Sequence, residues 1–565
     1  MSYRRLWIAF ALVIVGSFTV LGYFGREIYR AAPPVPERVV TTDGRVLWTG
    51  AEIKDGQNVW QSTGGQELGT VWGHGSYVAP DWSADWLHRE AVLMLERWAM
   101  EEHGAPFAEL AAETRAALQA RLQSELRANT YDAETGDLVV SPLRAEAIEA
   151  TARHYRALFS DDPALADLRE AYAMKTPTVS DPQRLHQLTG FFFWTSWACV
   201  TERPGEAITY TNNWPPEEIV GNVPQPALHL WTGFSVILLI AGIGVLAWWY
   251  ASHRDDSIDH SELPDRDPLL GLAPTPSMQA TLKYFWVVTA LILVQVGMGV
   301  VTAHYGVEGG GLYGFELSEI LPYSLSRTWH IQLAIFWIAT SWLATGLFIA
   351  PAVSGHEPKY QRLGVNVLFG ALLVIVVGSL AGQWASIMQR LGLETGFWFG
   401  HQGYEYVDLG RFWQIFLLAG LFIWLFLMVR AIWPALRRGE DTRSLLGMFV
   451  IASAAIAVFY GAGLMWGRQT NLAIAEYWRW WVVHLWVEGF FEVFATVVIA
   501  FLFVRLGLLR TKLATGAVLF STNIFLVGGI IGTFHHLYFT GTPTSILALG
   551  ATFSALEVVP LVLIG

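Results

Sequence analysis

The chain has 565 residues, 53% of them hydrophobic, and a mean hydropathy of +0.37. This composition is too apolar for an ordinary soluble protein and predicts a protein of the lipid bilayer. The formal net charge of -12 gives no indication of nucleic-acid binding. The single cysteine, Cys199, excludes an intrachain disulfide and a Cys-x-x-Cys-His site for covalently attached haem c. An electron-transfer role would therefore need non-covalent cofactors or a partner.

The chain begins with two arginines, Arg4 and Arg5, followed by an apolar run over residues 6–24. A signal peptide is one interpretation, but the run is long for its apolar region and no clear small-x-small cleavage site follows. We therefore expect residues 1–24 to form an uncleaved transmembrane anchor with its N-terminus in the cytoplasm.

Residues 25–226 form the one large soluble segment. Ala, Leu, Glu and Arg at helical spacing predict helices between residues 90 and 169, whereas the Gly-, Trp- and His-rich stretch 56–90 predicts irregular structure. Residues 210–216 are typical of a loop that returns to the membrane. Because this domain follows the anchor, we expect it to be extracytoplasmic.

Residues 227–565 contain repeated apolar runs of about 20 residues, each long enough to span a bilayer. Together with the anchor they predict ten spans, the nine after it lying near 229–252, 281–303, 329–351, 363–385, 411–434, 445–466, 480–505, 515–538 and 543–565. The basic loops alternate as the positive-inside rule requires. The loops expected in the cytoplasm hold Arg254, Lys359, Arg362, Arg437, Arg438, Arg510 and Lys512. The expected fold class is an all-α polytopic membrane protein.

His484, Glu488 and Glu492 recur every fourth residue in an apolar run, so we expect them on one face of a helix. Ionisable groups inside a bilayer are costly and indicate a functional site. His535 and His536 end another apolar run, which reaches a similar depth from the opposite direction. Imidazole and carboxylate ligands suit iron, manganese or zinc, so we predict a metal centre between the two helices. The alternative is a set of interfacial side chains satisfied by hydrogen bonds between helices.

Further positions have both a functional and a structural interpretation. Glu492 and Glu557 could carry protons or simply be protonated, hydrogen-bonded side chains. His330, at the start of an apolar helix, could ligate a haem or lie at a helix interface. His304 and Glu308, at a membrane edge, could bind a quinol headgroup or form an ordinary polar helix end.

Glu405 and Asp408 lie in a loop on the outer side of the membrane. Their hard oxygen atoms suit calcium. The alternative is that both carboxylates are simply solvated.

Three of these motifs resemble the large subunit of bacterial nitric oxide reductase, in the haem-copper oxidase superfamily. They are His484–Gly489 (HLWVEG), Phe534–Gly541 (FHHLYFTG) and Phe553–Glu557 (FSALE).

The N-terminal segment resembles the single-chain, quinol-dependent form of that enzyme. The motifs are Gly56–Trp60, Trp72–Trp82 and Tyr210–Pro216. In that form a cytochrome c-like domain without haem c precedes the catalytic helices, and the resemblance runs from about Arg4 to the last residue. It implies a haem-copper oxidase-like helix bundle over residues 227–565.

The resemblance implies a role for each matching residue. His484, His535, His536 and Glu488 would be ligands of a non-haem iron, and Glu557 the carboxylate beside it. His330 would be an axial ligand of a low-spin haem b, His304 and Glu308 the quinol site, and Glu405 with Tyr77 a calcium site.

The implied reaction turns two molecules of nitric oxide, two electrons and two protons into nitrous oxide and water, a step of denitrification. Two iron centres would hold both molecules close together, with membrane quinol as the electron donor. The cofactors would be a low-spin haem b, a high-spin haem b, non-haem iron and calcium. The expected location is the bacterial inner membrane, and a homodimer is one expected form.

The sequence departs from the family pattern at one point. The superfamily carries two further haem ligands as a His-x-His pair on a later helix, but no histidine follows His536 before Gly565. We therefore expect this chain to be a C-terminally truncated fragment that is inactive by itself.

Three alternatives remain open. An oxygen-reducing haem-copper oxidase would carry a tyrosine where Glu488 stands and would bind copper. A nitric oxide dismutase would be expected to lack His304, Glu308 and Glu488, all present here. A non-catalytic membrane scaffold or transporter would bind no haem.

Overall fold

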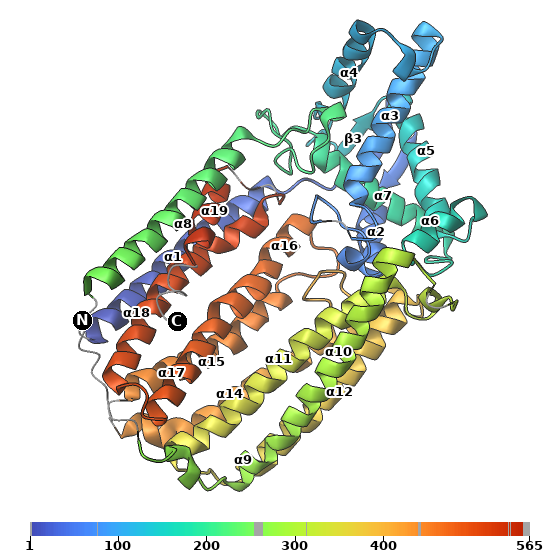
Figure 1. Ribbon diagram of the computed structural model, residues 1–565. Helices are drawn as coiled ribbons and strands as arrows, with labels where there is room; N and C mark the ends of the chain where they lie inside the picture. Colours follow the sequence, from blue (N-terminus) through green and yellow to red (C-terminus); the bar gives the residue numbers. More distant parts are fainter. Residues whose placement is uncertain are drawn as a thin grey trace.

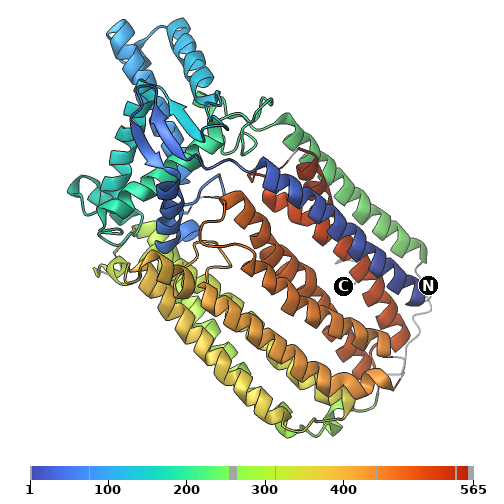
Figure 2. The ribbon, with the colours of Figure 1, turned by 180° about the vertical axis from the view of Figure 1, so that it is seen from behind.

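The computed structural model describes residues 3–75, 77–253, 264–311, 314–438, 442–540, 542 and 544–557. A long helical bundle carries a smaller, mostly helical domain at one end (Figure 1). The chain's N-terminus lies at the other end of the bundle, as Figure 2 shows from behind. Helix α1 therefore runs the length of the bundle before the N-terminal domain begins.

The N-terminal domain combines helices with a small sheet. Its main elements are β1 (Arg38–Thr41), β2 (Val46–Thr49), α2 (Gly50–Ser62), α3 (Trp82–His103), α4 (Ala112–Arg127), β3 (Asp137–Val140), α5 (Pro142–Phe159), α6 (Ala166–Ala171) and α7 (Pro182–Val200). The strand order is β2-β1-β3, with β1 antiparallel to β2 and parallel to β3. The prediction of irregular structure over 56–90 was wrong at both ends, where α2 and α3 lie, and the sheet was not predicted.

Helix α7 forms the core of this domain. The Asp181 side chain accepts hydrogen bonds from the first-turn N–H groups, and Pro182 occupies the first helical position. Every residue from Gln187 to Val200 is buried. A helix that is apolar on all sides must be covered on all sides, which explains why α2, α3 and α5 pack around it.

The bundle contains long helices together with a few short ones. They are α1 (Tyr3–Ala31), α8 (Pro226–His253), α9 (Pro276–Ala280), α10 (Leu282–Glu308), α11 (Tyr323–Ser354), α12 (Gln361–Ile387), α13 (Leu393–Phe399), α14 (Arg411–Arg437), α15 (Arg443–Tyr460), α16 (Leu472–Trp480), α17 (Glu492–Arg505), α18 (Thr511–Gly532) and α19 (Thr544–Leu556). Within the described residues, nine helical segments are long and apolar enough to cross a membrane. They match the anchor and the first eight of the nine later spans. The last predicted span is described only as the shorter α19, since residues 558–565 lie outside the described chain.

The bundle helices differ in how much of their apolar surface other helices cover. Only 6% of the apolar window of α8 is buried, against 67% in the segment that begins with α18. Apolar side chains face lipid without penalty, so α8 suits the outside of the bundle and α18 the inside.

The predicted helix 480–505 is not uniform. Residues Trp481–Phe491 form a π-helix (η8), which separates α16 from α17. A π-helix bonds i to i+5 and has a wider turn than an α-helix. Glu492 begins α17 and is exposed, whereas His484 is buried, and the shared helix face stays a prediction.

Candidate metal centre

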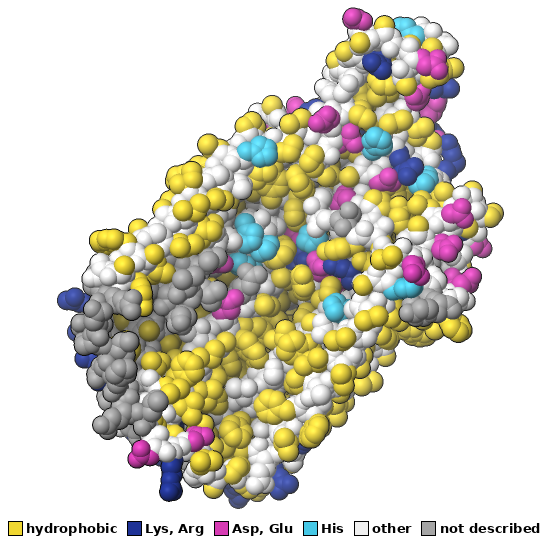
Figure 3. All heavy atoms as spheres, viewed as in Figure 1, with side chains coloured by type: hydrophobic (Ala, Val, Ile, Leu, Met, Phe, Trp, Pro, Cys, Tyr) yellow, Lys and Arg dark blue, Asp and Glu magenta, His cyan; other side chains and the backbone are white. Residues whose placement is uncertain are grey.

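Three histidines from two helical segments meet inside the bundle. The ring centroid of His484, on η8, lies 5.4 Å from that of His535 and 5.1 Å from that of His536. The rings of His535 and His536, on the short helix η9 (Thr533–Leu537), are 3.7 Å apart. Histidine side chains gather where the face of the bundle is hollowed (Figure 3). The predicted convergence of the two clusters is therefore present in the fold.

Backbone carbonyl groups fix the orientation of two of these rings. Nε2 of His484 donates to the Gly529 carbonyl (2.8 Å), and Nδ1 of His535 donates to the Gly532 carbonyl (2.6 Å). In each ring the other nitrogen is then the one suited to ligate a metal. This arrangement is the usual way in which a protein sets the tautomer of a metal-binding histidine.

The third ring, His536, is held by an aromatic stack. The Trp480 ring lies 3.6 Å from it at an interplanar angle of 6°. Nε2 of His536 is buried and has no hydrogen-bond partner among the described residues. A buried nitrogen without a partner is costly, and a metal ion would satisfy it.

The donor set fits a metal such as iron, but the described residues do not form a closed cage. No group of three or more His, Cys, Asp or Glu side chains in the described part of the chain is arranged as a ready metal site. The side chain of Glu488, the predicted oxygen ligand, lies outside the described residues. The metal and its full ligand set therefore stay predictions.

Glu557 lies beside the histidines, after the end of α19. Its Oε1 is 3.6 Å from His484 Nε2, and its side chain is 14% exposed. The carboxyl fits against glycines of α18: a Cβ on Gly532 would lie 2.8 Å from Oε1, and one on Gly528 would lie 2.8 Å from Cγ. These glycines leave the space that Glu557 occupies.

Replacing Gly532 with alanine should displace the Glu557 carboxyl and the backbone near Ser554, which the new Cβ would approach at 3.3 Å. We expect a loss of about 1–3 kcal/mol in stability, as for other overpacked sites. Gly516→Ala on the same helix is the matched control, because nothing lies within 4 Å of its added Cβ. Thermal unfolding of the two variants in detergent measures the difference, and equal midpoints would contradict the close fit.

His330, the predicted haem ligand, lies apart from the three histidines, between α10 and α11. Its Nδ1 donates to the Gln295 carbonyl (2.9 Å), and a Cβ on Gly299 would lie 2.7 Å from its Cε1. Gly299 therefore admits the imidazole between the two helices. The ring orientation is defined as in a metal-binding histidine, while haem ligation stays a prediction.

His304 and Glu308, the predicted quinol pair, lie together in the last turn of α10. His304 Nε2 is 3.5 Å from Glu308 Oε2 and 2.9 Å from the Gly311 carbonyl. The Glu308 side chain is 64% exposed. The next residue but one, Gly310, donates to the carbonyl of Glu170 in the N-terminal domain (2.8 Å). The pair thus lies at the edge of the bundle where the two domains meet.

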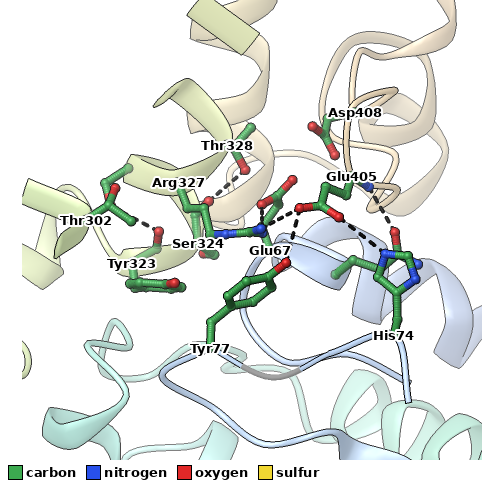
Figure 4. Close-up of polar contacts among 12 residues, drawn as sticks. Glu67, His74, Tyr77, Thr302, Tyr323, Ser324, Arg327, Thr328, Glu405 and Asp408 are labelled. Atoms are coloured by element: carbon green, nitrogen blue, oxygen red, sulfur yellow. Dashed lines mark hydrogen bonds and ion pairs between the residues drawn. The ribbon is translucent and has the colours of Figure 1, made fainter. Parts of the chain in front are cut away.

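Glu405 and Asp408 are buried, so the alternative of solvated carboxylates was wrong. Figure 4 shows the Arg327 guanidinium between the Glu67 and Glu405 carboxylates, to both of which it donates hydrogen bonds. Tyr77, whose ring lies 3.6 Å from the Arg327 Cζ, donates to Glu405 Oε1 at 3.3 Å. The N-terminal domain is therefore joined to the bundle by a buried ionic cluster.

A second arginine extends this cluster toward the histidines. Arg479 lies 2.8 Å from Glu476 and 3.6 Å from Glu405, and it is fully buried. Its Cζ is 4.5 Å from the Trp480 ring, whose other neighbour is His536. The ionic cluster and the candidate metal centre are thus in contact through Trp480.

The sequence reasoning did not find Glu67, Arg327 or Arg479. A usable signal existed, since Arg327 and Arg479 are charged residues at the ends of apolar runs, three and five positions before His330 and His484. Charged residues at such depth are rare unless paired. Their carboxylate partners lie far away in the sequence, in segments that carry no comparable pattern.

The two loop carboxylates differ in charge. Burial alone would raise the pKa of Glu405, but the His74 hydrogen bond and the Arg327 and Arg479 guanidinium groups outweigh it and lower that pKa to about 2. Burial raises the pKa of Asp408 to about 8, although Gln332 donates to it. Glu405 is therefore ionised at neutral pH, whereas Asp408 is largely protonated.

Calcium would require six to eight oxygen ligands. Here the Arg327 guanidinium lies between the Glu67 and Glu405 carboxylates. A calcium ion bound by Glu405 would therefore have to displace this guanidinium. Calcium at Glu405 and Tyr77 stays a prediction.

Comparison with known proteins defines the class of this molecule. The family described as cytochrome c and quinol oxidase polypeptide I matches residues 279–564, about half of the chain. The chain therefore belongs to this family, whose members are polytopic membrane proteins of the haem-copper oxidase type. The family described as the cytochrome c-like domain of the nitric oxide reductase protein NorB matches residues 36–216.

One curated relative narrows the comparison. The NorB protein of nitric oxide reductase from Stutzerimonas stutzeri is 24% identical over 286 residues, which cover 50% of this chain and 57% of that protein. The chain thus spans little more than half of that relative. Together these matches confirm the expected fold class: a helical membrane bundle preceded by a cytochrome c-like domain, here without a haem c motif. They also support an oxidoreductase of the nitric oxide reductase or oxidase type.

Proposed function

We propose that this chain belongs to a quinol-dependent nitric oxide reductase, an enzyme that reduces two molecules of nitric oxide to nitrous oxide and water. The observation that carries the proposal is the meeting of His484, His535 and His536, with Glu557 3.6 Å from His484. Three imidazoles and a carboxyl in an apolar bundle suit a metal-centred reduction that consumes protons.

The three imidazoles, with Glu488 from the same helix as His484, would hold a non-haem iron. When bound, this iron and a neighbouring high-spin haem b would supply the two sites at which nitric oxide is bound and reduced. In the bilayer, the apolar helices around the centre would limit the access of bulk water. The backbone carbonyls of Gly529 and Gly532 orient the His484 and His535 rings, so little rearrangement is needed on metal binding.

Protons for the reaction would pass through Glu557. Its Oε1 is buried without a hydrogen-bond partner among the described residues and points at the His484 ring. A carboxyl in this position can accept a proton and donate it toward the histidine cluster.

Replacing Glu557 with glutamine should lower nitric oxide consumption by about 10²- to 10⁴-fold, the range for loss of a general acid. Glu492→Gln, at an exposed position of α17, should change the rate much less. Turnover would be followed with a nitric oxide electrode on purified full-length protein, with iron content as the control for an intact centre. Equal rates in the two variants would exclude Glu557 from proton delivery.

Electrons would enter from membrane quinol at His304 and Glu308 and pass to a low-spin haem b ligated by His330. The pair lies at the membrane edge beside the N-terminal domain, where a headgroup could approach from the bilayer. This arrangement supports an inner-membrane protein with the anchor over 1–24, the extracytoplasmic domain over 25–226 and the catalytic bundle over 227–565. A homodimer is compatible with it.

The proposal is tested with the full-length protein in membranes. Addition of a reduced quinol and nitric oxide should give nitrous oxide in the ratio of one per two nitric oxide molecules consumed. Metal analysis of the purified protein should give iron and no copper.

An oxygen-reducing oxidase is the second candidate, since the matched family contains such enzymes by its description. Glu488 stands where those oxidases carry a tyrosine, and a carboxylate favours iron over copper. Copper in the purified protein, with quinol-driven oxygen uptake, would establish this alternative.

A further inference from the structure

The bundle has a basic pocket at the end remote from the N-terminal domain. The loop before α14 contacts that domain through Glu405, so the last residues of α14 lie at the opposite end, with the starts of α15 and α1. The pocket has a volume of about 480 Å³ and is lined by residues of all three helices. The polar ones are Arg437, Arg443 and Ser444; Trp7 and Trp433 form apolar walls.

Neither arginine of this pocket forms an ion pair with a described carboxylate; Glu440 and Asp441, between them in the sequence, lie outside the described residues. The Arg437 guanidinium lies 5.0 Å from the Trp433 ring, and Trp7 reaches Ser444 through its ring N–H (3.5 Å). Two exposed guanidinium groups that face one cavity repel each other in the absence of an anion. The described lining of the pocket thus carries the positive charge that an anion-binding site needs.

An apolar groove continues from the pocket along α14. It has a volume of about 540 Å³ and shares Trp433 with the basic pocket. The other lining residues are Phe422, Leu425, Phe426, Val429 and Arg430. Phe422 and Phe426 are 47% and 62% exposed, so a large part of each ring faces outward.

The dimensions of the groove match one leaflet of a bilayer. From residue 422 to residue 433, α14 rises by roughly 16 Å at 1.5 Å per residue. This is about half of a hydrocarbon core of ~30 Å. A ligand with a negative head in the basic pocket and an apolar tail in the groove would cover both.

We propose that Arg437, Arg443, Trp433 and the outer face of α14 form a binding site for one anionic phospholipid. The phosphate would lie between the two guanidinium groups, near the Ser444 hydroxyl, and one acyl chain would lie along Phe422 and Phe426. Tryptophan and arginine at the level of the headgroups are typical of such sites, and basic pockets between transmembrane helices bind anionic headgroups. Arg430, at the edge of the groove, adds a third positive charge.

The site is tested on the full-length protein in detergent. Phosphatidylglycerol added to the delipidated protein should raise the unfolding temperature by about 3 °C or more, because a ligand that binds only the folded state stabilises it. Phosphatidylcholine should give a much smaller rise, since it carries no net charge. An equal rise with both lipids would mean non-specific solvation and would overturn the proposal.

Two double variants test whether the rise in unfolding temperature comes from this pocket. Arg437→Gln/Arg443→Gln should abolish the rise with phosphatidylglycerol. Lys359→Gln/Arg362→Gln, which removes the same charge from the loop and helix start between α11 and α12, should retain it. Loss of the rise in both double variants would indicate a general charge effect and exclude the site.

Two further measurements distinguish a bound lipid from free phosphate and from a second copy of the chain. Inorganic phosphate at millimolar concentration should not reproduce the rise; if it does, the pocket binds free phosphate and not lipid. Light scattering of Phe426→Gln should give the wild-type mass and a reduced phosphatidylglycerol effect. A changed mass with an unchanged lipid effect would show that a second copy of the chain covers the groove and would refute the lipid site.

Discussion

Full-length protein in which alanine replaces His536 should lose its non-haem iron and at least about 100-fold of its nitric oxide reductase activity. Changes to residues that merely support a metal ligand already cost about 10- to 100-fold. We expect a larger loss for His536, a predicted ligand itself. Its buried Nε2 has no partner among the described residues, and its ring contacts both other imidazoles. Iron per polypeptide, measured by elemental analysis, and nitric oxide consumption are the two readouts.

The matched control for this variant is His229→Ala. His229 is an exposed histidine in the first turn of α8, far from the other rings in the sequence. It should keep wild-type iron content and activity. Haem content should be unchanged in both variants, which excludes general unfolding as the cause. Retention of iron by His536→Ala would exclude this residue as a ligand.

Substitution of Arg327 by methionine should destabilise the protein by about 3–5 kcal/mol, the usual cost of breaking a buried ion pair by removing one partner. The side chains of Arg327 and Glu67 are 9% and 0% exposed. Removal of the guanidinium leaves the Glu67 and Glu405 carboxylates without the cation between them. Thermal unfolding should show a large loss, and limited proteolysis should show release of the N-terminal domain from the bundle.

An exposed ion pair between the same two regions provides the control. Arg468 lies 3.8 Å from Asp55, with side chains 33% and 30% exposed. Arg468→Met should cost about 1 kcal/mol or less, because water screens the pair. Equal losses in the two variants would contradict a structural role for the buried cluster.

A double variant isolates the charge effect. Glu67→Gln removes one of the two carboxylates that Arg327 neutralises. Arg327→Met/Glu67→Gln should therefore be less destabilised than Arg327→Met, since fewer uncompensated charges stay buried. A double variant that is less stable by the sum of both single losses would show that the two side chains act independently.

Much of the architecture followed from the sequence because its causes are local. A run of about 20 apolar residues must span the membrane whatever surrounds it. The anchor and the first eight later spans were predicted on this basis, and nine such helical segments lie in the described residues. The motifs around His484 and His535 also predicted that these histidines would lie close together, because charged and imidazole side chains in apolar runs need a functional reason.

The errors arose where local pattern and tertiary contact disagree. Glu492 keeps the four-residue spacing that His484 and Glu488 begin, but it is exposed in the structure, whereas His484 is buried. The loop around Glu405 looked like a solvated turn, because nothing near it in the sequence predicts its buried contacts with Arg327 and Arg479, or the place of Glu67 beside them. Small strands in a mostly helical domain were missed, since four residues are too few for a clear alternation.

The sequence by itself determined the membrane character, the order of the spans and the residues of the candidate metal centre, because each depends on composition or spacing within one helix. Only the tertiary structure decided which side chains from distant segments contact one another. The carbonyls that orient His484 and His535, the glycines that accommodate Glu557 and the arginine between Glu67 and Glu405 all come from distant segments. Such partners are selected by the packing of helices against one another, which no local pattern records.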